Sequence, residues 1–119
     1  MEIRELEQDE LQALEAHAKT IALKYGISKV HVYVAYDSEI GEFVHGFYKE
    51  PSYTQKLFAM DKIATVGTFA AGEELRQALT LTGEGESHPF IYQKDEYKLA
   101  IVGLCIGLIQ VAQNQFKKK

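Results

Sequence analysis

The segment LAIVGLCIGLIQVA, from Leu99 to Ala112, constrains the fold more than any other part of the sequence, because it is almost wholly apolar. Burying one large aliphatic side chain contributes roughly 1.5–3 kcal/mol, so the eight in this segment represent on the order of 12–24 kcal/mol. A folded domain is stable by only about 5–15 kcal/mol. The segment therefore has to be covered, by the rest of the chain or by a partner. Its large aliphatic residues are Leu99, Ile101, Val102, Leu104, Ile106, Leu108, Ile109 and Val111.

The same segment is too short to cross a membrane, which takes about 18 or more consecutive apolar residues. It contains Gln110 and is flanked by the polar stretches KDEYK and QNQFKKK. Gly103 and Gly107 form a GxxxG pair, which outside a membrane is typical of a close helix crossing. We expect no membrane contact, and a central helix that is partly exposed at its far end.

The composition is that of one acidic globular domain. The chain has 119 residues, 46% of them hydrophobic and 25% charged, which is enough for a modest core. A formal net charge of −4 gains nothing from counterion release on a nucleic acid. The single Cys105 fits a reducing compartment, and the acidic start MEIRELEQDE is unlike a secretory signal. We expect a single cytoplasmic domain over residues 1–119, with no nucleic-acid partner.

The first part of the chain predicts a helix and then a hairpin. Residues 1–26 form an amphipathic helix that ends at Gly26, since a glycine often follows the last helical turn. Its apolar stripe is Leu11, Leu14, Ala18, Ile21 and Tyr25. Residues 29–49 alternate with a period of two on both sides of the turn sequence DSEIGE, which predicts a β-hairpin.

The predicted hairpin is apolar on both faces. A turn that pairs Tyr33 with His45 places His31, Phe43 and Phe47 on one face, and Val32, Val34 and Val44 on the other. Helices must then cover at least one face. A two-stranded sheet is also marginal by itself, so we expect a third strand or a homo-oligomeric partner.

Residues 51–117 predict a helical part. Pro51 suits the first position of a helix whose stripe is Tyr53, Leu57, Met60 and Ala64. After a break around Gly67, a second helix turns inward Ala71, Leu75, Ala78 and Leu79. TGEGESHPF is expected to be a plain polar loop, and Asp95 opens the last helix. The fold class is α+β: an N-terminal helix, a hairpin and three helices, with the apolar C-terminal helix at the centre.

No group of residues indicates a chemical reaction. Cys105 lies among aliphatic residues with no base near it in sequence, as is typical of a buried structural thiol. His31 and His45 are candidates to face each other across the hairpin, but no third ligand has a recognisable metal spacing. The TGEGES loop has neither the ligand pattern of an EF-hand nor the lysine of a phosphate loop. We expect no catalytic residue, no metal and no cofactor.

Most of the chain, about residues 29–112, resembles a group of small proteins encoded by tailed phages and prophages. The resemblance lies in the order of four short motifs, each of them ordinary turn or packing chemistry. They are Tyr48-Lys49-Glu50-Pro51 at the end of the hairpin, Ala59-Met60-Asp61-Lys62, Ala71-Gly72-Glu73, and the loop from Gly83 to Ser87 before the last apolar helix. The N-terminal helix departs from the shorter family pattern, which begins nearly at the hairpin.

That group resembles tail-assembly chaperones, which keep the long apolar tape-measure protein soluble while the tail tube forms. The resemblance implies a non-enzymatic homo-oligomer in the bacterial cytoplasm that masks apolar helices of a tail protein. Candidate partner-binding residues, chosen for adaptable apolar contact, are Phe58, Met60, Phe69, Ile106, Ile109 and Phe116. Two alternatives stay open: a structural adaptor retained in the virion at the head–tail junction or in the tail, and a small-ligand-binding domain or enzyme with an unrecognised pocket.

Overall fold

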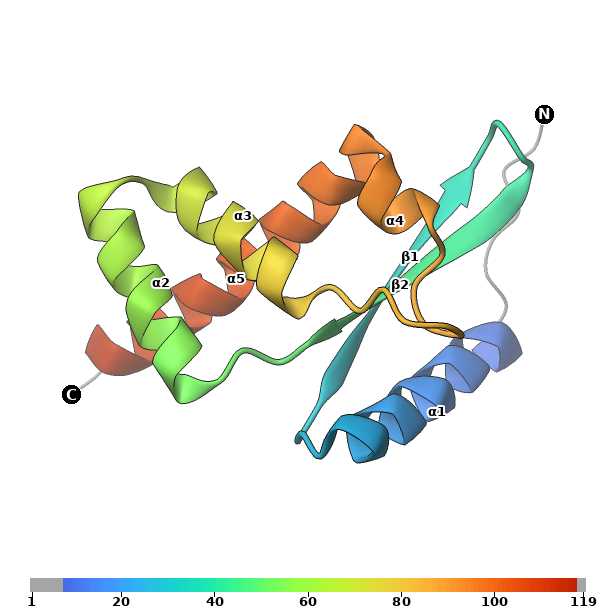
Figure 1. Ribbon diagram of the computed structural model, residues 1–119, viewed down its shortest axis with the longest axis horizontal. Helices are drawn as coiled ribbons and strands as arrows, with labels where there is room; N and C mark the ends of the chain where they lie inside the picture. Colours follow the sequence, from blue (N-terminus) through green and yellow to red (C-terminus); the bar gives the residue numbers. More distant parts are fainter. Residues whose placement is uncertain (1–7, 118–119) are drawn as a thin grey trace. The chain divides into compact units, whose positions relative to one another are not determined.

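The computed structural model describes the backbone of residues 8–117 and the side chains of residues 8–114. Its elements confirm the α+β class (Figure 1). Contacts divide the chain into two compact units. The hairpin unit joins the chain up to Glu50 with Thr80–Gln93, and the helical unit joins Pro51–Leu79 with the chain from Lys94 onward. The single domain expected over residues 1–119 stays a prediction. The elements are α1 (Gln8–Tyr25), β1 (Val30–Asp37), β2 (Glu42–Lys49), α2 (Tyr53–Thr65), α3 (Thr68–Leu79), α4 (Phe90–Gln93) and α5 (Asp95–Lys117).

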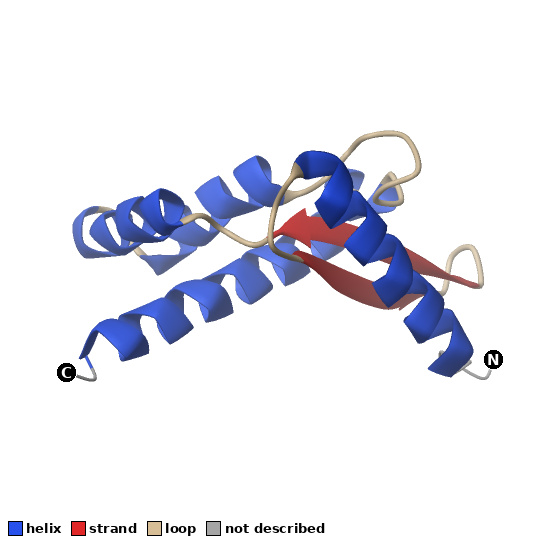
Figure 2. Cartoon of the chain, turned by 90° about the horizontal axis from the view of Figure 1, so that it is seen from below, coloured by secondary structure: helices blue, strands red, loops and turns tan. Residues whose placement is uncertain are grey.

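In the hairpin unit, α1 lies against the antiparallel pair of β1 and β2 (Figure 2). The helix ends as expected at Gly26, whose φ of +66° is the left-handed conformation that glycine adopts at little cost. The core between the helix and the sheet is one apolar cluster, which accounts for the amphipathic stripe of α1. Its buried members are Ala18, Ile21, Ala22, Val30, Phe47 and Leu81.

The register of the hairpin differs by one residue from the expected one. Tyr33 faces Gly46, and His45 faces Val34. The expected pairing implies a three-residue turn, whereas four residues separate Asp37 from Glu42, with the Gly41 N–H donating to the Asp37 C=O at 2.8 Å. Because strand side chains alternate, this shift reverses the faces of one whole strand.

The shift changes which side chains lie together. Phe43, His45 and Phe47 share the α1 face of the sheet with the valines of β1, and Val44 lies on the opposite face. The predicted grouping of Phe43 and Phe47 with His31 is therefore wrong. His31 and His45 also lie on opposite faces, so they do not face each other as a pair of metal ligands.

The segment between α3 and α4 is more than a polar connection. Leu81 donates its N–H to the C=O of Phe47, and His88 donates to that of His45, both at 2.9 Å. Thr80 also forms an isolated antiparallel bridge with Tyr48. The segment thus follows the outer edge of β2 in the manner of an irregular third strand. It was not predicted because its glycines indicate a loop.

The second face of the hairpin is covered by the short helix α4. Ile91 is 1% exposed and packs on Gly46, where a Cβ atom would lie 2.8 Å from the Cγ2 of Ile91. No helix was expected here, because four residues are too few to show a helical period. The expectation that helices must cover the hairpin is confirmed, with α1 on one face and α4 on the other.

The helical unit consists of α2, α3 and α5, and α5 contacts both other helices. Ser52 caps α2: its side chain accepts the N–H of Gln55 at 3.2 Å, and the Gln55 side chain accepts the N–H of Ser52 at 2.8 Å. Pro51 therefore precedes the cap and does not take the first helical position. The apolar stripe expected on α2 is not its buried side. Ala59 is its buried residue, whereas Tyr53 is 76% exposed.

The close approach of α3 to α5 takes place at Gly72. A Cβ atom there would lie 2.7 Å from the Cγ1 of Ile106 and 3.1 Å from the C=O oxygen of Val102. At Gly103 and Gly107 of α5 an added Cβ would contact no other element among the described residues, so the predicted crossing at GxxxG is wrong. Along α3 the interior positions are Ala71, Gly72, Leu75 and Leu79, and Ala78 is exposed instead of buried.

Helix α5 is covered on one side only over the part whose side chains the structure describes, residues 95–114. Ile101, Val102, Cys105 and Ile109 are buried. The opposite side exposes Leu99 by 69%, Leu104 by 39% and Val111 by 56%. Exposure was expected only at the far end, but Leu99 lies in the second turn. The covering helices α2 and α3 are too few to surround the aliphatic surface on every side.

Candidate partner-binding surface

Large exposed apolar side chains are concentrated on the helical unit. We call the members found there the exposed apolar set. Such surface is costly in water, and in folded proteins it commonly marks a binding site for another macromolecule. The hairpin unit contributes fewer, among them Leu23 on α1. The exposed apolar set is Tyr53, Leu57, Phe58, Val66, Phe69, Leu99, Leu104 and Val111.

The residues predicted to bind a partner fall into three groups. Phe58 and Phe69 are 64% and 78% exposed, so a partner can reach them directly. Met60 and Ile106 are half-buried. Ile109 is completely buried and belongs to the interior, which removes it from the accessible surface. The side chain of Phe116 lies outside the described residues.

Most of the exposed apolar set was not predicted from the sequence. On α2, apolar residues occupy two sides of the helix, and only the stripe with the regular spacing was singled out. The structure turns that stripe, which includes Tyr53 and Leu57, toward solvent. The signal was present in the sequence, because a helix that is apolar on two sides either is central or exposes one of them.

A shallow groove runs between α2 and α3. Phe58 and Ala59 form one wall, Ala71, Leu75 and Ala78 form the other, and Gln55 and Glu74 stand at its rim. Its volume of about 110 Å³ is below the range of about 300–1,000 Å³ that is usual for small-molecule sites. The groove is of a size for one apolar side chain of a partner protein.

A second depression lies between α3 and the start of α5. Leu99 and Val102 provide its apolar part, and Glu73, Asp95 and Lys98 provide its charged rim, around a volume of about 230 Å³. Lys98 and Asp95 form an ion pair at 3.7 Å on that rim. Apolar contact surface and charge therefore alternate over the helical unit.

Arg76 and Glu73 form the best-defined ion pair of the helical unit. Arg76 donates from Nε and from a terminal nitrogen to the two carboxylate oxygens, at 2.5 and 2.7 Å. These hydrogen bonds hold the pKa of Glu73 at about 2, against the opposing effect of burial, and they raise the pKa of Arg76. The Arg76 side chain is only 12% exposed, so the pair is largely shielded from solvent on the arginine side.

This pair makes the helical unit sensitive to acid. A carboxylate with a depressed pKa in the folded state stabilises it above the ordinary value of 4.5, and that contribution is lost as the pH falls toward 2. Because Glu73 is partly exposed, we expect Glu73→Gln to cost only about 0.5–1 kcal/mol at pH 7. The difference from wild type should shrink at pH 3 in urea titrations. Asp61→Asn makes an equal charge change at an exposed site on α2 and should leave the pH dependence of stability as in wild type. If Asp61→Asn lost as much stability as Glu73→Gln with the same pH dependence, the effect would not come from the Glu73–Arg76 pair.

The residues considered for other chemistry are buried or make contacts with neighbouring side chains. Cys105 is 0% exposed, and burial raises the pKa of its thiol to about 11, which keeps it protonated. His31 stacks on Tyr48 at 4.9 Å between ring centroids and lies 2.7 Å from a carboxylate oxygen of Glu50. Burial lowers the pKa of His45. Within the described residues, no group of three or more histidine, cysteine or acidic side chains is arranged to hold a metal ion.

No helix in the described part of the chain combines the length and hydropathy that a membrane span needs. Comparisons with protein-family models, with characterised proteins and with solved structures give no significant match to this chain.

Proposed function

We propose that this chain is a non-enzymatic phage or prophage accessory protein that acts as a tail-assembly chaperone. It would cover apolar helices of a tape-measure protein in the cytoplasm of the bacterial host until the tail tube forms. The observation that carries the proposal is the exposed apolar set, because eight large apolar side chains on the helical unit are left in water. The order of motifs shared with small phage proteins supports the same assignment.

The helical unit has features that suit an apolar helical client. Phe58 and Phe69 lie on the neighbouring helices α2 and α3 and are the two phenylalanines of the exposed apolar set. Burying one such side chain contributes roughly 1.5–3 kcal/mol, so two anchors support a reversible complex. An amphipathic helix presents side chains at intervals of three and four residues to a groove of this kind. The charged rims at Glu74 and Lys98 keep the complex solvated.

Co-expression with the tape-measure protein tests the proposal. Wild-type chain should raise the soluble fraction of the tape-measure protein, and the double variant Phe58→Ser/Phe69→Ser should lose most of that effect. Both positions are exposed, so the variant should keep wild-type circular dichroism. Leu23→Ser is the matched control, since Leu23 is 84% exposed but lies on the hairpin unit. A double variant that protects as well as wild type would refute the proposal.

The composition of purified particles separates this function from that of a structural adaptor. A chaperone leaves the tail when assembly is complete, so mass spectrometry should not detect the chain in mature virions. Stoichiometric chain in the particle would instead assign it to the tail or to the head–tail junction.

A further inference from the structure

One edge of the hairpin has no sheet neighbour among the described residues. β2 lies between β1 on one side and the segment from Thr80 to His88 on the other, whereas β1 pairs with β2 alone. The C=O groups of His45 and Phe47 accept hydrogen bonds from that outer segment, so they point away from β1. The orientation of these two groups fixes the hydrogen-bonding pattern of the whole strand pair.

The outward groups of β1 follow from this pattern. In an antiparallel pair, residues that face each other turn their N–H and C=O groups either toward each other or both outward. Val34 faces His45 and Val32 faces Phe47, so both valines turn these groups to the free edge, as does Val30 two residues earlier. Between Val30 and Asp37 the strand contains no proline, lysine or glycine, the residues that commonly protect an edge from pairing.

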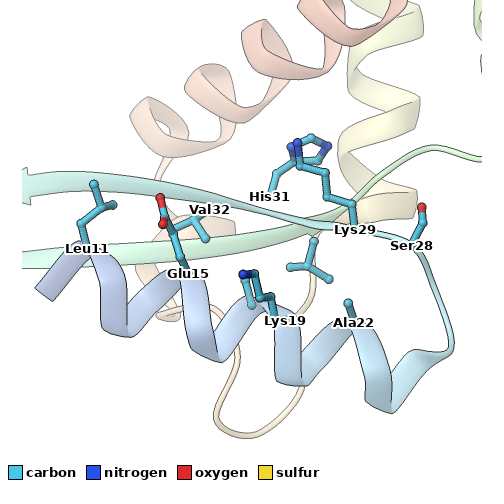
Figure 3. A pocket seen from close by; sticks show the side chains of 10 residues that line it. Leu11, Glu15, Lys19, Ala22, Ser28, Lys29, His31 and Val32 are labelled. Atoms are coloured by element: carbon cyan, nitrogen blue, oxygen red, sulfur yellow. The ribbon is translucent and has the colours of Figure 1, made fainter. Parts of the chain in front are cut away.

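A groove borders this edge. It is about 470 Å³ in volume, with the chain from Ser28 to Val32, which leads into β1, on one side and α1 on the other. In Figure 3, Leu11, Glu15 and Lys19 rise from α1 toward the strand. The groove thus combines unpaired backbone groups with an apolar floor and two opposite charges on its outer wall.

We propose that the outer edge of β1 pairs with the same edge of a second copy of this chain. The two β1 strands run antiparallel about a two-fold axis at Val32, and the hairpins join into a continuous sheet with the order β2-β1-β1-β2. This inference concerns the hairpin unit and is independent of the client surface on the helical unit.

The register follows from the outward groups. Two-fold pairing of one edge with itself requires that the outward-turned residues face each other. An axis at Val32 places Val32 opposite Val32 of the partner subunit, and Val30 opposite Val34 of the partner subunit. This register uses all three outward valines. A shift by one residue would bring outward groups against inward ones and would lose the ladder.

The charges on α1 favour a second copy over an unrelated extended peptide. The same axis places the two α1 helices antiparallel on one face of the joined sheet. Glu15 then approaches Lys19 of the partner subunit, and Lys19 approaches Glu15 of the partner subunit. Glu15 and Lys19 both line the groove beside Val32. Each copy therefore presents one negative and one positive charge, which match the opposite charges of a second copy across the two-fold axis.

Disulfide trapping of the full chain tests the register. Facing residues in a bonded antiparallel pair lie about 5.5 Å apart between Cα atoms, which a disulfide can span. We expect Val32→Cys to form a covalent dimer under mild oxidation. Val34→Cys is the matched control: it is another half-buried valine of the same edge, but its symmetry mate lies about 14 Å away. Buried Cys105 should not react. Equal trapping at both positions, or none at Val32→Cys, would overturn the proposal.

Charge reversal tests the same interface without touching the core. Glu15→Lys and Lys19→Glu should each raise the dimer Kd in sedimentation by about tenfold, since each turns two attractions into repulsions. The double variant Glu15→Lys/Lys19→Glu should restore the wild-type dimer Kd, because it recreates both attractions. Glu84→Lys, the same change on an exposed loop, should have no effect. At about 100 μM chain, a dimer with a Kd below about 10 μM is mostly formed. If the chain stays monomeric at that concentration, the proposal is wrong.

Discussion

Replacing Gly72 with alanine is expected to destabilise the helical unit by about 1–2 kcal/mol, although alanine is the better helix former. The new methyl group would lie 2.7 Å from the Cγ1 of Ile106 and 3.0 Å from a methyl group of Val102. The C=O oxygen of Val102 at 3.1 Å belongs to the helix backbone, which cannot move aside as a side chain can. The cost of forcing α3 away from α5 therefore exceeds the gain in helix propensity.

The same change from glycine to alanine on α5 should increase the stability of the helical unit instead of lowering it. Gly103→Ala and Gly107→Ala place a methyl group in open space, so each should stabilise the helix by up to about 1 kcal/mol. Urea unfolding followed by helical circular dichroism measures all three variants under one condition. Amide hydrogen exchange of α3 and α5 then shows whether the loss is confined to the helical unit. If Gly72→Ala were as stable as Gly103→Ala, the two helices would not approach closely at Gly72.

The contrast between these glycines shows what sequence pattern can and cannot predict. GxxxG is conspicuous because two glycines recur at the helical spacing, yet the contact is made by a single glycine of the neighbouring helix. Which helix presents its glycine depends on how α3 and α5 rotate about their axes. That rotation is set by the whole of the packed interior, including Leu75 and Ile101, and not by any local motif.

Elements with a strong local signal were predicted correctly. The stop at Gly26, the hairpin and the start of α5 at Asp95 all follow from short-range rules of glycine, strand alternation and acidic first turns. The register of the hairpin was wrong because it depends on one residue of turn length. The turn sequence DSEIGE allows a loop of three or four residues, and only the bond from Gly41 to Asp37 distinguishes them.

The candidate surface was predicted in part, for a related reason. Phe58 and Phe69 were identified by residue type, and both are accessible. Ile109 was assigned to the same surface because α5 is apolar on nearly every side, so its period does not show which side is covered. Tyr53 belongs to the regularly spaced stripe of α2, whereas Ala59, on a different side of that helix, is the residue that is buried.

The second large effect is expected at Glu86, a carboxylate that sequence pattern placed in a solvated loop. Its side chain is 2% exposed and accepts hydrogen bonds from the Tyr25 hydroxyl at 2.7 Å, the Gly83 N–H at 2.8 Å and Lys24 Nζ at 3.4 Å. It therefore joins the end of α1 to the segment beside β2. Glu86→Ala removes a buried carboxylate that accepts all three hydrogen bonds and should destabilise the hairpin unit by about 2–4 kcal/mol.

The dependence on pH distinguishes a charged anchor from simple packing. Burial raises the pKa of Glu86, but the hydrogen bonds from Tyr25, Gly83 and Lys24 outweigh it and leave the pKa below its ordinary value of 4.5. The stabilisation is then present above that value and is lost as the pH falls below it. Urea titrations of Glu86→Ala should accordingly show a free energy of unfolding that is well below wild type at pH 7 and closer to wild type at pH 3.

Glu86→Gln, which keeps the shape and loses the charge, should show a smaller loss of stability with the same dependence on pH. Glu84→Gln, two residues away and exposed, is the matched control and should follow wild type throughout. A Glu86→Ala deficit that stayed constant from pH 7 to pH 3 would mean that Glu86 contributes through packing alone, and the charged link to α1 would be wrong.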